Sequence, residues 1–294
     1  MRERFKGLYY KHYKKLFFLP LILVLVALSI LAFNFQTTGD IIQKDVSLRG
    51  GTTATITNAE PFPGLESQLR DEFPEGDFFV RDLKEFGSDV QVGVVVEVSN
   101  VDPDDLREAL EEVTGLELTS ENYSVEFVGS SLGESFYRQM AIAIILAFIF
   151  MAFVVFITFR SFIPSFMVVF AAFADMVCTL AFLSLFGFQI STAGIAAILL
   201  LIGYSIDTDI LLTTKVLKRK DGSIFERLFD GSKTGLTMTI TTVVALTVGY
   251  FVSTSLVLKQ MFMIIVIGLL IDVIMTYAMN AGLLVWYAKK KRLH

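Results

Sequence analysis

The chain has 294 residues, of which 54% are hydrophobic and 28 are phenylalanine. Several apolar runs of about 20 residues exclude an ordinary soluble domain and predict an integral membrane protein. The formal charge of −5 hides an asymmetry: residues 1–15 contain six basic residues and one glutamate, whereas 36–136 contain 22 acidic and six basic residues. The single cysteine, Cys178, excludes an intrachain disulfide, and two distant histidines argue against a zinc site.

Six membrane spans and one polar segment are predicted from this pattern. A cytoplasmic N-terminus at 1–15 precedes the first span at 16–35. That span is interpreted as uncleaved, because it is longer than a signal-peptide core and no small-residue cleavage pattern follows it. An extracytoplasmic domain is predicted at 36–136, a five-helix bundle at 137–288 and a cytoplasmic tail at 289–294. The five spans of the bundle are expected at 137–159, 164–186, 190–214, 234–254 and 260–287.

The orientation follows from the positive charges in the short loops. The basic N-terminus, Arg160, the loop at 215–233 and the basic tail all fall on one side of the six predicted spans. We therefore expect both ends in the cytoplasm and residues 36–136 outside a plasma membrane. The basic loops are expected to contact anionic lipid headgroups.

The polar segment is predicted to fold as a small α+β domain. Strand-like patterns at 52–57, 77–86, 90–98 and 123–128 alternate with helical spacing at 64–73 and after Asp102. The order βαββαβ predicts a ferredoxin-like sandwich. This fold assigns no function by itself.

Four acids interrupt the apolar spans, and each costs about 2.5–3.5 kcal/mol on insertion scales. They are Asp175, Asp207, Asp209 and Asp272. Asp207 and Asp209 point about 200° apart on a helix, and Asp207 shares a small-residue face with Gly203. We therefore expect Asp207 to face inward and Asp209 to lie toward the cytoplasmic boundary.

Two interpretations of these acids remain open. Acids in a low dielectric readily hold protons, which favours a proton or ion relay. Alternatively, each acid is a hydrogen-bonding anchor between helices. Lys233 begins the fifth span and can pair with an acid, while Thr237 and Thr241 follow it as relay candidates or as ordinary helix-packing residues.

Phosphate-binding and zinc motifs are absent from the sequence, which argues against a nucleotide-driven enzyme. No cofactor, metal or nucleic-acid partner is predicted.

Three blocks together resemble the SecD/SecF family of protein-export membrane proteins, an RND-type superfamily. Their order, spacing and topology match over almost the whole chain. The blocks are 48–52 with Arg49, Gly50 and Gly51, 125–134 with Gly129 and Gly133, and 203–209 with Gly203, Tyr204 and Ser205.

One outer domain points to the SecF branch of the family. The order Asp207-Thr208-Asp209 differs from the bacterial Asn-Asp-Thr and looks like the archaeal type. The resemblance implies half of an RND-type transporter that pairs with SecD. It further implies that the pair assists the Sec translocon, a SecYE-type channel, with proton-motive force moving the outer domains on the translocating preprotein.

We therefore predict a non-enzymatic export subunit in which Asp207 and Asp175 are the leading ion-linked residues. The alternatives are a stand-alone proton-coupled RND-type transporter of small solutes and a passive scaffold of the translocon.

Overall fold

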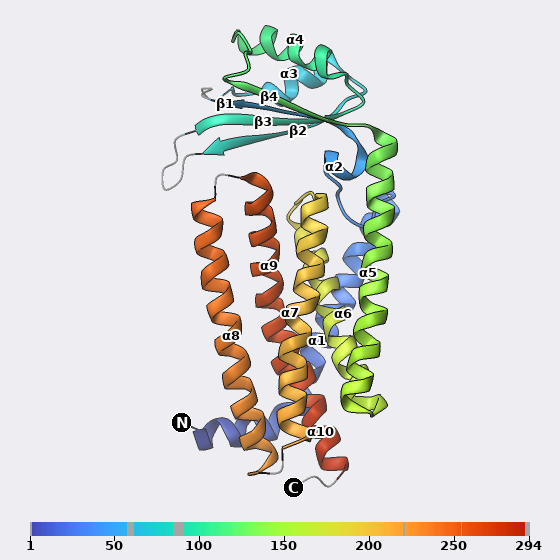
Figure 1. Cartoon of the computed structure of the whole chain (residues 1–294), viewed down its shortest axis with the longest axis vertical. Helices are drawn as coiled ribbons and strands as arrows, with labels where there is room; N and C mark the ends of the chain where they lie inside the picture. The colour runs from blue at the N-terminus through green and yellow to red at the C-terminus, as the bar shows by residue number, and fades with distance from the viewer. Residues whose placement is uncertain (1, 58–61, 85–90, 220, 254, 292–294) are drawn as a thin grey trace. The chain divides into compact units, whose positions relative to one another are not determined.

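A computed structural model describes residues 2–57, 62–84, 91–219, 221–253 and 255–291, without the side chains of 2–16 and 84. Part of the expected tail, residues 292–294, lies outside the described residues. The chain divides into two compact units. One contains 1–43, 143–189 and 193–294, and the other contains 44–142 and 190–192. Figure 1 labels the elements of both in chain order.

The larger unit is helical. Its elements are α1 (Arg2–Thr38), α5 (Ser130–Phe159, whose first turns belong to the smaller unit), α6 (Phe162–Leu185), α7 (Thr192–Leu217), α8 (Ile224–Val252), α9 (Leu256–Ile274), the π-helix η1 (Met275–Asn280) and α10 (Ala281–Lys290). Among the described residues, six segments are long and apolar enough to cross a membrane. The prediction of six spans is confirmed. The last span, Leu256–Lys290, consists of α9, η1 and α10 in succession.

Small side chains bring α1, α6 and the last span together. Ala27 of α1 and Ala171 and Ala174 of α6 are buried in one cluster with Met275 and Met279 of η1. Such residues let helix backbones approach closely, which is how membrane helices associate without a hydrophobic driving force. In contrast, only 11% of the 18-residue apolar stretch of α5, and likewise of α8, is buried within this chain. These two helices therefore present most of their surface to lipid or to another protein.

The smaller unit contains a four-stranded antiparallel sheet. Its elements are α2 (Val46–Arg49), β1 (Gly51–Thr57), α3 (Leu65–Glu72), β2 (Asp77–Lys84), β3 (Gln91–Ser99), α4 (Pro103–Thr114) and β4 (Tyr123–Val128). The strand order is β2-β3-β1-β4, with α3 and α4 on one face (Figure 1). This is the predicted ferredoxin-like sandwich. Alternating residues such as Ala54, Ile56 and Val96 supply the core under the two helices.

The other face of the sheet contains a partly buried charge cluster under α2. Glu97 is 3% exposed and forms an ion pair with Arg81, while Arg49 forms one with Asp77. Asp45 caps α2 by accepting from the Ser47 amide at 2.9 Å. Burial raises the pKa of both Asp45 and Glu97 above the ordinary values, because removal from water disfavours the charged form.

Two glycines allow the start of β1 to contact the start of α5 within the smaller unit. Gly50 has φ +84°, and a Cβ there would lie 2.4 Å from the Ser130 Cα. A Cβ on Gly133 would lie 2.6 Å from the Gly50 nitrogen. No side chain fits at either contact, since real Cβ atoms do not approach backbone this closely. The close approach gives a physical reason for glycine in two of the three sequence blocks.

We expect Gly133→Ala to destabilise the smaller unit by about 1–3 kcal/mol, because the added methyl group forces backbone apart. Gly129→Ala is the matched control, since a Cβ there meets nothing within 4 Å. The measurement is hydrogen–deuterium exchange of the β1 and α5 peptides in the full chain. Equal exchange in the two variants would contradict the packing argument.

The charge cluster predicts a pH dependence of stability in the sheet. A carboxyl group with a raised folded-state pKa binds its proton more tightly when folded. Its stabilising effect is therefore complete below the ordinary value of 4.5 for Glu97 and is lost as pH rises through the raised value. We expect β3 amides to be better protected from exchange at pH 5 than at pH 7.

Glu97→Gln should flatten this dependence, because the amide does not titrate and the partly exposed Arg81 remains solvated. Glu126→Gln, on the exposed strand β4, is the control. If both variants keep the wild-type pH profile, Glu97 is not the titrating group.

Candidate functional site, a buried carboxyl network

Three of the four predicted membrane acids converge in the helical unit. Asp175 of α6, Asp209 of α7 and Asp272 of α9 are each 1% exposed or less. They come from three helices that are far apart in the sequence. The acid of α7 that joins Asp175 and Asp272 in the interior is Asp209 and not the expected Asp207.

Ser205 of α7 binds Asp175 of α6. Its hydroxyl donates to Asp175 Oδ2 at 2.5 Å. Ser205 is itself fully buried and lies one helical turn before Asp209.

Thr276 and Asn280 extend the network to Asp209. The Thr276 Oγ1 lies 3.1 Å from Asp209 Oδ1 and 3.1 Å from Asp272 Oδ1. Asn280 Nδ2 donates to the same Asp209 oxygen at 2.6 Å. Thr276 thus joins Asp272 to Asp209, while Ser205, one turn before Asp209 on α7, binds Asp175.

The π-helix places these donors. Asp272, Thr276 and Asn280 are spaced four residues apart, and a regular α-helix would turn successive members of that series steadily away from one another. The wider turn of η1 reduces this drift, so Thr276 and Asn280 both reach Asp209 Oδ1. Single-turn π-segments of this kind occur often at functional sites.

No Lys or Arg in the described ranges forms an ion pair with the three acids. Three negative charges in a dry cluster would repel one another strongly, so the network needs bound protons to be stable. Asp175 Oδ1 and Asp209 Oδ2 are buried without a hydrogen-bond partner. The described residues contain no group of three His, Cys, Asp or Glu side chains placed to hold a metal ion.

The expectation that Asp207 faces inward is wrong for this chain. Asp207 is exposed, and Asp209 occupies the buried face. The small residue Gly203 suggests a close helix contact on the Asp207 face, but a Cβ at Gly203 would meet nothing within 4 Å. The buried face of α7 contains Leu201, Ser205 and Asp209 instead.

The structure does not bring the candidates on α8 to the network. Lys233, Thr237 and Thr241 are exposed, and the two threonine hydroxyls donate to carbonyl groups of their own helix. The Thr237 bond to the Lys233 carbonyl is 2.8 Å long. Helix packing between α7 and α8 instead uses Gly231 and Gly235. A role for the three exposed residues stays a prediction.

The three sequence blocks that resemble the family contain residues of two kinds: some make structural contacts in the smaller unit, and one belongs to the carboxyl network. Gly50 and Gly133 make the close backbone contact in the smaller unit, and Arg49 pairs with Asp77. In the third block, Gly203 and Tyr204 are exposed on α7, whereas Ser205 enters the network. The sequence prediction did not include Thr276 and Asn280, although their positions four and eight residues after Asp272 were a usable signal.

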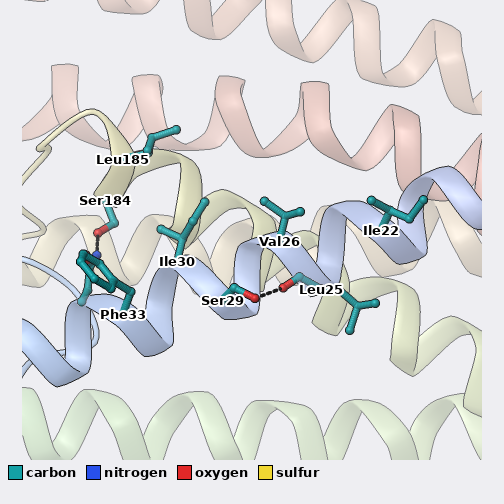
Figure 2. A pocket seen from close by; sticks show the side chains of 9 residues that line it. Ile22, Leu25, Val26, Ser29, Ile30, Phe33, Ser184 and Leu185 are labelled. Carbon is teal, nitrogen blue, oxygen red and sulfur yellow. Dashed lines mark hydrogen bonds between the residues drawn. The ribbon is translucent and has the colours of Figure 1, made fainter.

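A separate groove of about 560 Å³ lies between α1 and α6. Figure 2 shows its largely apolar lining, which includes Leu25, Phe33 and Leu185. Asn34 also lines the groove and donates a hydrogen bond to Ser184. No acidic residue lines the groove. It is therefore not an extension of the carboxyl network.

Comparison with known proteins gives the family. The family model described as "Protein export membrane protein SecD/SecF, C-terminal" matches residues 108–290, a range that contains all the network residues. The chain belongs to the SecD/SecF family. A SecF protein of Pyrococcus furiosus is 37% identical over 99% of this chain and 96% of its own length. A SecF protein of Methanolacinia petrolearia is 36% identical over 94% of each chain.

The SecD/SecF fold is also found by structure. A crystal structure of SecDF from Thermus, titled a translocon-associated membrane protein, matches with a TM-score of 0.71 at 19% identity. The match covers 95% of this chain and 38% of that chain. This SecF-like chain is thus a multi-pass membrane protein with a role in protein export, and its fold is similar to part of the SecDF chain.

We expect Asp209→Ala to lower the stability of the SecF-like chain by about 1–3 kcal/mol, because Thr276 and Asn280 lose their shared acceptor. Asp207→Ala should change the stability of the isolated chain by less than about 0.5 kcal/mol, since Asp207 is exposed. Thermal unfolding in mild detergent measures both. A larger loss for Asp207→Ala would contradict the assignment of the buried face.

Proposed function

We propose that this chain is a non-enzymatic SecF-type subunit that pairs with a SecD-type protein and assists Sec-dependent translocation. The near full-length similarity to SecF relatives supports this role. The chain corresponds to 38% of the SecDF chain, so a partner is needed to supply the remainder. The Sec translocon, a SecYE-type channel, and the translocating preprotein are the further partners of the proposed complex.

We propose that the carboxyl network couples proton movement to export. The observation that carries this proposal is the burial of Asp175, Asp209 and Asp272 on three helices, joined by hydroxyl groups and without an ion pair to a described Lys or Arg. A purely structural anchor needs one acid and its donors. Three adjacent acids instead form a site whose charge changes by whole protons, and such a change alters the packing of the helices that hold them.

The exposed polar face of α7 and α8 is the proposed contact with the SecD-type subunit. Asp207 lies on α7, and Lys233 and Thr237 lie on α8, which packs against α7 through Gly231 and Gly235. An acid left facing lipid costs about 2.5–3.5 kcal/mol on insertion scales. A protein partner that hydrogen-bonds Asp207 removes this cost.

The proposed orientation places both chain ends in the cytoplasm and the sheet domain outside. The distribution of basic residues supports it, because Lys218, Lys289 and Lys290 end spans on one side. The outer domain is then placed to move with respect to an emerging preprotein, and the basic ends are placed to contact lipid headgroups.

The test is export in vesicles that contain the chain, its SecD-type partner and the translocon under an imposed proton gradient. Asp175→Asn, Asp209→Asn or Asp272→Asn should each reduce gradient-stimulated export by about tenfold or more, since an amide neither takes up nor releases a proton. Asp221→Asn makes the same chemical change in an exposed loop and should leave export unchanged.

Copurification with the partner serves as the assembly control for each variant. Full gradient stimulation in all three network variants, with normal assembly, would refute proton coupling through this network. A chain that forms only a self-dimer and moves small solutes would instead support the stand-alone transporter.

A further inference from the structure

Thr276 occupies a position that couples the protonation of two acids. Its Oγ1 is fully buried and lies 3.1 Å from Asp209 Oδ1 and 3.1 Å from Asp272 Oδ1. A hydroxyl group has one proton to donate, and its oxygen accepts from other donors. Both contacts are full hydrogen bonds when Thr276 donates to one carboxylate and accepts from a protonated carboxyl group on the other side.

Two mirror arrangements satisfy this requirement. In one, protonated Asp272 donates to Thr276, which donates to ionised Asp209. In the other, protonated Asp209 donates to Thr276, which donates to ionised Asp272. We propose that the Thr276 hydroxyl is the proton relay between Asp272 and Asp209, an assignment that rests on the proposed proton coupling.

The step is balanced in atoms and charge. The Asp272 O–H bond breaks as its proton binds the Thr276 oxygen, and the original hydroxyl proton of Thr276 passes to Asp209. Thr276 ends as a neutral hydroxyl group, and one negative charge has moved from Asp209 to Asp272. No additional reactant is needed.

A second buried threonine of the helical unit has the same spacing from an acid but does not bind a carboxyl group. Thr179 follows Asp175 by four residues, as Thr276 follows Asp272, and both are fully buried. Thr179 donates to the Asp175 backbone carbonyl at 2.7 Å, the usual bond of a helical threonine. Thr276 lies in the π-helix η1, where backbone pairing no longer follows the i−4 pattern, and its hydroxyl contacts carboxyl groups.

Two further side chains hold the acids around Thr276 in place. Ser205 donates to Asp175 Oδ2 at 2.5 Å, one helical turn before Asp209 on α7. The Asn280 amide fixes Asp209 Oδ1 at 2.6 Å but has no transferable proton at neutral pH, so Asn280 is a positioning residue. The oxygens Asp175 Oδ1 and Asp209 Oδ2 are buried without a hydrogen-bond partner.

The test compares three threonine variants in the vesicles with the partner and translocon, with a pH-sensitive dye reporting proton uptake. Thr276→Val keeps the shape but removes the hydroxyl and should slow proton uptake by about tenfold or more. Thr276→Ser keeps the hydroxyl and should stay within about twofold of wild type. Thr179→Val should also stay near wild type.

A second readout separates a relay from a structural role. Infrared difference spectra of the full chain report protonated carboxyl groups during a pH titration. In wild type and Thr276→Ser, the signals removed by Asp209→Asn and Asp272→Asn should titrate together, whereas Thr276→Val should separate them. If Thr276→Val fails to fold, Thr276→Cys replaces it, because a thiol is a weak donor of similar size.

The outcomes distinguish the relay from the proposed function. Wild-type uptake and joint titration in Thr276→Val, while Asp209→Asn blocks uptake, would overturn the relay and leave proton coupling intact. Normal uptake in Asp209→Asn and Asp272→Asn would remove the proposed function and the relay together. Loss in Thr276→Val with rescue in Thr276→Ser supports the relay.

Discussion

Burial of three carboxyl groups among α6, α7 and the last span is the constraint on which the helical unit depends. Each acid would be costly in hydrocarbon, and none of them has an ion pair with a described basic residue. Their hydrogen-bond partners are Ser205, Thr276 and Asn280. These short side chains reach the acids only when each helix presents one particular face, so the network fixes the rotation of three helices together.

The two units treat buried charge differently. In the sheet domain, the buried Glu97 is paired with Arg81, whereas the exposed Asp77 pairs with Arg49 of α2. A buried pair such as Glu97–Arg81 loses stability when one partner is removed. In the helical unit the acids are bound by hydroxyl groups and one amide. Each bound proton removes one negative charge from this cluster, so its stability depends on how many protons are bound. This dependence is what the proposed coupling requires.

Much of the architecture was predictable because it depends on patterns that are local in the sequence. Apolar length gave six spans, and the alternation of strands and helices gave the ferredoxin-like domain. The presence of acids within three spans was equally visible. The choice of Asp207 over Asp209 failed because small residues such as Gly203 look alike whether they face another helix of this chain or an open surface.

The sequence by itself determined the class of the protein, the order of its elements and the cost of its intramembrane acids, since these follow from composition, period and length. Only the tertiary structure decided that Asp209 meets Asp272 through Thr276. The rotation of a helix is set by all its neighbours at once, and the π-helix that orients Thr276 and Asn280 has no local sequence pattern that distinguishes it from the α-helix around it.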